Sequence, residues 1–281
     1  MDSKHRQLVS EEIDLIFSSS VSSGARNKSA DGSSFNIQLE EGLQIPTDAR
    51  NVNVSVETAT IWNVSPNVIA GVNDQLYITA PNEATGASTV YQLTIPTGLY
   101  SLSDLNQAIQ RELSNAGAKI SPDPCVTLLA DTSTNKTEFR FNYTGIEIDF
   151  TPADTFRDIL GFNSQIVGPN ITAPLIYLAD NVAQFAVIQY YLVHSDIVNR
   201  GIRFNNDYSQ IISQVLITSP PGSQIVHTPF HPAKSNAQDL AGSLRRNIKF
   251  WLTDENNNLV STNSEDYSVG IKITYQVPQW I

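Results

Sequence analysis

Apolar and polar residues alternate along much of this chain, and a period of two residues is typical of strands with one buried face. The pattern is clearest at 269–277 and is repeated at 52–62. The apolar positions of the C-terminal run are Val269, Ile271, Ile273, Tyr275 and Val277. Further strands are predicted at 75–79, 89–95, 139–143, 185–193, 210–218 and 248–253, with Pro, Gly and Asn turns between them. The sequence therefore predicts an all-β, antiparallel architecture of many strands.

Two helices are predicted within this β pattern. The first covers about 102–116, where Ser101 can cap the helix and Asp104 can complete a capping box. Its apolar stripe consists of Leu102, Leu105, Ile109 and Leu113. The second is shorter, with a cap at Thr151 and a stop at Gly161. Because both helices lie in the middle of the chain, we predict a β-body, 35–281, with a mixed α/β insertion at about 99–178.

Residues 1–34 form a polar segment with ten serines and no long apolar run. Such a segment buries too little apolar surface to offset its chain entropy, so we predict an extended N-terminal arm held by neighbouring molecules. The alternative is that the arm folds back on its own domain. Five apolar residues could form a short helical face that anchors the arm on a partner: Leu8, Val9, Ile13, Ile16 and Phe17. At the other end, Trp280 is expected to dock on its own domain or on a neighbour.

The charge and the cysteine content of the chain limit the functions that the protein can have. Charged residues make up only 16% of the chain and the net charge is -11, which argues against direct nucleic-acid binding because phosphates are bound by Lys and Arg. The single cysteine, Cys125, excludes an intrachain disulfide and indicates synthesis in a reducing compartment such as a cytoplasm. No signal peptide and no membrane span are predicted.

Candidate catalytic groups are few. His227 and His231 have the spacing of two metal ligands on a helix, but Pro229 and Pro232 oppose a helix there. The consecutive residues His194, Ser195 and Asp196 cannot converge, because alternate side chains of a strand face opposite sides. Glu147 and Asp149 are expected on the exposed face of a strand, and Cys125 as a small buried hydrophobe. We predict no enzyme, and no catalytic, cofactor-binding or metal-binding residues.

The aromatic residues allow a different function. Trp62, Trp251 and Trp280 with Tyr190 and Tyr191 could line a sugar-binding groove, because sugars stack on flat rings. All except Trp280 lie within strand patterns, where a core or sheet-face position is favoured.

Several short motifs resemble capsid proteins of double-stranded DNA viruses. They are Tyr100-Ser101-Leu102-Ser103-Asp104-Leu105-Asn106, Ile148-Asp149-Phe150, Ile159-Leu160-Gly161-Phe162, Val193-His194-Ser195-Asp196-Ile197-Val198 and Leu252-Thr253-Asp254-Glu255-Asn256. The pattern is similar to the penton, or minor vertex, proteins of adenovirus-like viruses, virophages and related elements. The resemblance implies a jelly-roll β-sandwich with a long insertion between two strands, in a ring of five that closes a capsid vertex.

On this resemblance the chain is expected in the virion, as a homo-oligomer that forms the pentamer of a vertex. Its expected partners are neighbouring capsid proteins and a spike or fibre. Three alternatives stay open at this point. They are a major capsid protein, a receptor-binding spike or fibre, and a non-viral carbohydrate-binding β-sandwich.

Overall fold

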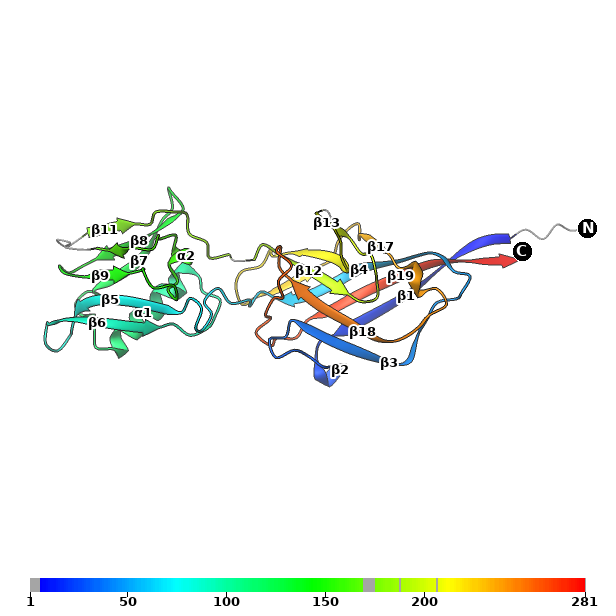
Figure 1. Cartoon of the computed structure of the whole chain (residues 1–281), viewed down its shortest axis with the longest axis horizontal. Helices are drawn as coiled ribbons and strands as arrows, with labels where there is room; N and C mark the ends of the chain where they lie inside the picture. Colours follow the sequence, from blue (N-terminus) through cyan, green and yellow to red (C-terminus); the bar gives the residue numbers. More distant parts are fainter. Residues whose placement is uncertain (1–5, 169–174, 187, 206, 281) are drawn as a thin grey trace, which may run out of the picture. The chain divides into compact units, whose positions relative to one another are not determined.

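The chain folds into two compact units, a β-sandwich and a unit inserted into it (Figure 1). The computed structural model describes residues 6–168, 175–186, 188–205 and 207–280. The sandwich contains the two ends of the chain, up to Ser65 and from Ile188 onward, and the inserted unit runs from Pro66 to Val187. Each unit has its own apolar core.

The first sheet of the sandwich has the strand order β1-β19-β4-β16, with β17 also paired to β4. All of its pairs are antiparallel. The strands are β1 (Arg6–Ser18), β4 (Arg50–Trp62), β16 (Gln224–His227), β17 (Lys234–Asn236) and β19 (Ser268–Trp280). Because β1 and β19 pair along their whole lengths, the first and last strands of the chain lie side by side (Figure 1).

The second sheet has the order β15-β12-β18-β3-β2, again antiparallel. Its strands are β2 (Ala25–Arg26), β3 (Ser34–Gln44), β12 (Tyr190–Ser195), β15 (Ile211–Leu216) and β18 (Leu244–Thr253). The connections add the 3-10 turns η1 (Val21–Ser23) and η2 (Gln238–Leu240) and the short pair β13 (Arg203–Phe204) and β14 (Asp207–Tyr208).

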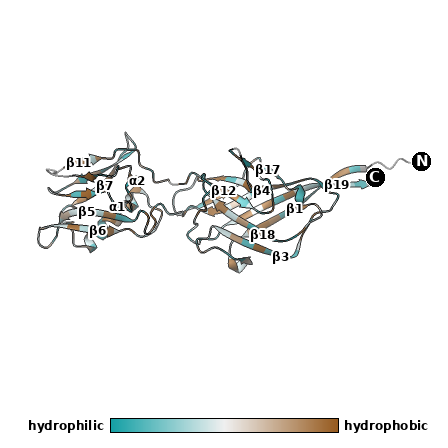
Figure 2. Ribbon diagram, viewed as in Figure 1, coloured by the Kyte–Doolittle hydropathy of each residue, from teal (hydrophilic) through white to brown (hydrophobic). Residues whose placement is uncertain are grey.

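Alternation along the strands builds the sandwich core. The five apolar positions predicted in the last strand are all buried, and their polar neighbours lie on the outer face of the first sheet. Figure 2 shows apolar and polar residues alternating along the strands of both units. Between the sheets, the Phe35 ring stacks on Phe250 and meets Tyr267 edge-on, at centroid distances of 5.4 and 5.2 Å. Aromatic pairs of this geometry add to the stability that burial supplies.

The inserted unit has two antiparallel sheets of its own, in the orders β10-β9-β5-β6 and β11-β8-β7. The strands of the first are β5 (Gln75–Pro81), β6 (Ser88–Thr94), β9 (Glu147–Asp149) and β10 (Ile166–Val167). Those of the second are β7 (Val126–Asp131), β8 (Lys136–Phe141) and β11 (Leu175–Leu178). The helices α1 (Leu102–Asn115) and α2 (Arg157–Leu160) complete the unit.

The first helix prediction is confirmed. The Ser101 hydroxyl accepts the Asp104 N–H while the Asp104 carboxylate accepts the Ser101 N–H, which forms the capping box. Three of the four predicted stripe residues, Leu105, Ile109 and Leu113, are fully buried.

The second helix prediction is wrong at its start. Thr151 does not cap a helix, because its N–H and its hydroxyl both donate to the Asp149 carboxylate. The helix is only four residues long and begins at Arg157. Its predicted end is confirmed, since Gly161 takes the left-handed conformation with φ 81°.

The two boundaries predicted for the chain differ from those observed. The inserted unit begins at Pro66 rather than near 99 and ends at Val187 rather than near 178, because β5 and β6 pair within it. From Arg6 to Ser18 the predicted arm is a strand of the sandwich, which corresponds to the folded-back alternative. The alternating pattern predicts that a segment is a strand, but it does not say which sheet the strand joins.

Candidate assembly surfaces

The predicted arm anchors lie on both faces of β1. They form a strand, not the short helix expected from their spacing, so alternate residues point to opposite sides. Val9, Ile13 and Phe17 share the core face, where Phe17 is only 4% exposed. Leu8 and Ile16 point outward and are 45% and 82% exposed. Phe17 is therefore a core residue, while Ile16 is available to a partner.

Trp280, predicted to dock at the C-terminus, ends β19 and pairs through its backbone with Arg6. Its side chain lies outside the described part of the chain. The last four residues of β19 extend past β4, whose pairing with β19 reaches Gln276. Figure 1 shows β1 and β19 continuing together beyond the other strands.

An apolar groove lies between the edges of the two sheets, beside β1 and β3. Its volume is about 380 Å³, and its lining residues are Ile13, Leu15, Leu39, Glu40, Glu41, Gly42, Leu43 and Gln44. Strand β3 has a bulge here. Gln38 pairs with Asn247 and Leu43 pairs with Arg245, so the four residues of β3 between these pairs lie opposite a single residue of β18. The bulge requires Gly42, which has φ 74° and would place a Cβ only 2.8 Å from Leu244 Cδ1. The exposed carboxylates of Glu40 and Glu41 form an acidic rim.

An exposed aromatic residue lies at the opposite edge of the first sheet. The loop between β16 and β17 carries Phe230, which is 91% exposed. Pro229 and Pro232 flank the pair Phe230 and His231, whose rings meet edge-on at 4.6 Å. Prolines restrict the loop backbone. This arrangement presents a phenyl ring to solvent on a constrained loop.

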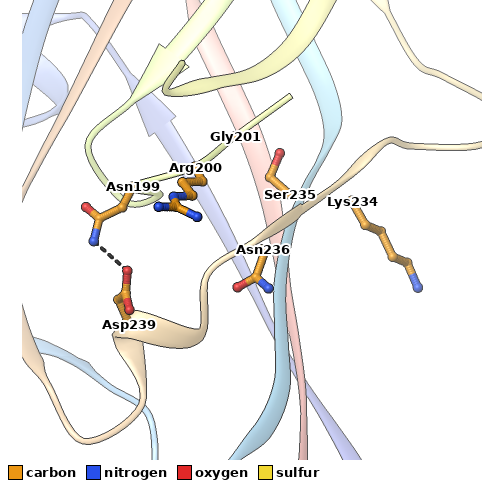
Figure 3. Close-up of a pocket in the computed structure, with 7 residues that line it drawn as sticks. All are labelled: Asn199, Arg200, Gly201, Lys234, Ser235, Asn236 and Asp239. Carbon is orange, nitrogen blue, oxygen red and sulfur yellow. Dashed lines mark hydrogen bonds between the residues drawn. The ribbon is translucent and has the colours of Figure 1, made fainter. Parts of the chain in front are cut away.

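A polar hollow of about 790 Å³ lies near the same edge (Figure 3). Its lining residues are Asn199, Arg200, Gly201, Lys234, Ser235, Asn236 and Asp239. The Asn199 amide donates to the Asp239 carboxylate at 2.5 Å. The hollow is wide and polar, and Figure 3 shows Lys234 pointing away from the Asn199–Asp239 pair. This surface can form hydrogen bonds with a partner.

His194 lies on the outer face of the second sheet and is nevertheless buried. Its Nε2 lies 2.8 Å from the Thr253 hydroxyl, and its ring stacks on Trp251 at 5.1 Å. Burial lowers the pKa of His194 from 6.5 to about 4. Ser195 points into the core and Asp196 accepts the Lys249 N–H. The three consecutive residues therefore perform separate structural roles.

The remaining candidate chemical groups are also separated. His227 hydrogen-bonds Ser213 at 3.2 Å, and so links a strand of the first sheet to one of the second, while His231 is exposed in its loop. Burial raises the pKa of the Cys125 thiol to about 11. Across the described ranges, no three His, Cys, Asp or Glu side chains form a metal-binding cluster. None of the described helices is long and apolar enough to cross a membrane.

The aromatic residues considered for sugar binding do not form one groove. Tyr191 is in the sandwich core, whereas Tyr190 faces the other side of the same strand. Trp62 belongs to the first sheet and Trp251 to the second. Glu147 and Asp149 flank the buried Ile148 on β9, and Asp149 accepts the two Thr151 hydrogen bonds.

A further exposed apolar strand, β11, lies at the edge of a sheet in the inserted unit. Leu175, Ile176 and Leu178 are 40%, 54% and 38% exposed. An exposed edge strand of apolar residues is a template for pairing with another chain. No local sequence pattern distinguishes β11 or Phe230, because the exposure of an apolar side chain depends on which other segments pack against it.

The motifs that carry the family resemblance lie in the cores and turns of both units. Ile148, Phe150 and Phe162 are buried in the inserted unit, and Val193 and Leu252 are buried in the sandwich. The resemblance therefore concerns residues that build the fold rather than residues of an active site.

The fold defines a mostly β protein, an antiparallel two-sheet sandwich with an inserted α/β unit. No protein-family model matches the sequence, and no curated protein is similar to it. Among solved structures, the chain is similar to the mavirus penton protein, determined as a crystal structure of its selenomethionine form. The TM-score is 0.47 and the identity 12%, over 98% of this chain and 100% of that one.

Proposed function

We propose that this chain is a structural capsid protein of a double-stranded DNA virus, of the penton type, and that its sandwich is a jelly roll. The observation that carries the jelly-roll part of the proposal is the strand order, and the inserted unit and the exposed surfaces carry the capsid part. With β2 and β17 set aside, the eight main strands are β1, β3, β4, β12, β15, β16, β18 and β19. If these eight strands are numbered in chain order, the first sheet has the order first-eighth-third-sixth. The second sheet has the order second-seventh-fourth-fifth. This is the order in which a jelly roll pairs its strands.

The position of the inserted unit supports the same proposal. It interrupts the jelly roll between the third and fourth main strands, β4 and β12. The family that the sequence motifs resemble is expected to carry a long insertion between two strands of such a sandwich. The jelly roll is also used by lectins and by enzymes of the cupin type, so strand order alone does not choose among these functions.

Surface chemistry favours assembly over ligand binding. The aromatic side chains that could stack on a sugar are divided between two sheets, and the sandwich core is filled with apolar side chains. In contrast, Ile16, Val226 and Phe230 are exposed on strands and loops of one sheet. Exposed apolar residues beside open sheet edges are features of surfaces that contact other protein.

On this proposal the mechanism is geometric. The jelly roll acts as a rigid wedge, five wedges pack around an axis, and outer surfaces contact neighbouring capsid proteins. The chain acts in the virion and catalyses no reaction. The N-terminal strand contributes to the wedge itself, and outward-facing side chains such as Ile16 contact the neighbouring capsid proteins.

Native mass spectrometry and negative-stain imaging of the purified full-length chain test this function. A five-membered ring is the expected result, with the same protein present in purified particles at a lower copy number than the main shell protein. Trimers would favour a major capsid or fibre protein. A monomer that binds a glycan on an array would contradict the capsid proposal and indicate that the protein is a lectin.

A further inference from the structure

The two open edges of the first sheet have complementary surfaces. One edge has the apolar groove beside β1, rimmed by Glu40 and Glu41, and the other presents Phe230 on its constrained loop. Within the described residues β1 pairs only with β19, so its outer edge has free backbone groups. We propose that Phe230 of one copy docks into the groove of a second copy of this chain, in a head-to-tail contact.

Charge supports a second copy as the occupant of the groove. The segment from Val226 to Gln238 has no acidic residue and carries one lysine, Lys234. The groove carries Glu40 and Glu41 on β3, and both residues are exposed. Complementary charges orient two partners and speed their encounter. A copy of the same chain thus supplies both the apolar side chain and the matching charge.

The register of the strands places the two surfaces at the same level. The loop that carries Phe230 joins His227, which pairs with Ala59, to Lys234, which pairs with Ser55. The loop is therefore beside 56–58 of β4. On the other edge, the groove residues Ile13 and Leu15 align through β19 with Val54 and Val56.

This alignment determines the kind of assembly. A head-to-tail contact forms a closed ring when successive copies are related by rotation alone, and a helical filament when each copy also rises. Because Phe230 and the groove lie at one level along the strands, a rotation about an axis parallel to the strands brings them together without a rise. The inference deepens the proposed function and depends on it, since it identifies the surfaces that close the proposed ring.

A substitution series tests the contact by the oligomeric state of the full-length chain. Phe230→Ala and Phe230→Asp should weaken ring formation at least about tenfold, as expected for an aromatic residue at the centre of an interface. Leu259→Ala is the matched control, because Leu259 is 62% exposed on the same unit but belongs to neither surface. Its ring should be unchanged.

Cysteine cross-linking identifies the partners of the contact. Cys125 is buried, so Phe230→Cys and Glu40→Cys each introduce one accessible thiol. Under mild oxidation a mixture of the two variants should give mixed dimers, and each variant alone should not. The double variant should give a ladder of cross-linked species that ends at the ring size.

The outcomes separate this inference from the proposed function. The head-to-tail contact is overturned if the ring persists in Phe230→Ala, or if Phe230→Cys forms cross-links only with itself. Neither result contradicts the capsid function. A full-length chain that stays monomeric up to its solubility limit would overturn both.

Discussion

The Phe17 ring lies against the Phe250 ring, with centroids 5.1 Å apart and planes inclined at 39°. Phe17 is on β1 of the first sheet and Phe250 on β18 of the second, so this contact joins the N-terminal strand to the opposite layer of the sandwich. The strand is further held by Glu11, whose carboxylate accepts the Tyr275 hydroxyl at 2.9 Å. The N-terminal segment is therefore part of the core rather than an appendage.

Phe17→Ala should reduce the free energy of unfolding of the sandwich by about 3–5 kcal/mol, because it removes a buried ring and leaves a cavity. The matched control is Ile16→Ala, one residue away on the exposed face, which should change stability by less than about 0.5 kcal/mol. Urea unfolding followed by fluorescence measures both. Equal effects of the two substitutions would show that β1 is not held in the sandwich.

The sandwich should lose stability between pH 6.5 and 4. Burial lowers the folded-state pKa of His194 to about 4, so the unfolded state binds the proton first as the pH falls. The stabilisation is complete above pH 6.5, and its loss reaches about 3 kcal/mol near pH 4. Burial also lowers the pKa of His227, which adds to the loss in the same direction.

His194→Gln should flatten this pH dependence, because glutamine can retain a hydrogen bond to Thr253 without titrating. Thermal melting at a series of pH values measures the effect, with the exposed His231→Gln as control. The carboxylates with shifted pKa values, such as Asp31 and Asp266, have values below the usual range, so their titration affects stability only at lower pH. An unchanged slope in His194→Gln would refute the role assigned to His194.

The two units should unfold in separate transitions, because each has its own apolar core. Phe150→Ala tests this in the inserted unit, where the Phe150 ring lies 5.1 Å from Phe162 and 6.2 Å from Phe139. We expect a loss of about 3–5 kcal/mol in one calorimetric transition. Phe17→Ala should shift the other. A single transition that both substitutions shift equally would mean that the units unfold as one.

The Cys125 thiol should be nearly inert in the folded protein. It is fully buried and its pKa is raised to about 11, so little thiolate forms at neutral pH. A thiol reagent should modify the chain about as slowly as the inserted unit opens, and much faster in urea. Ser133→Cys, in an exposed turn, provides a reactive control. Rapid modification of Cys125 in the native chain would contradict its placement in the core.

Local signals predicted those elements whose chemistry is complete within a short segment. The capping box of Ser101 and Asp104 satisfies the first turn of α1 by itself, and the strict alternation of 269–277 defines both faces of β19. The start of α2 was missed because Asp149 binds Thr151 before that residue can cap a helix. The strand β1 was missed for a different reason. Val9, Ile13 and Phe17 are four residues apart, a spacing that fits one face of a helix and also one face of a strand.

The sequence by itself determined the predominance of strands, the first helix, the absence of a disulfide and the acidic balance, because each depends on composition or on neighbouring residues. Only the tertiary structure decided which sheet each strand joined, where the inserted unit began, and that Phe230 and the groove of Ile13 and Leu39 lie on opposite edges at one level. These features depend on pairing between residues far apart in the chain. The free energy of such pairing comes from surfaces that meet only after folding, so no local pattern records it.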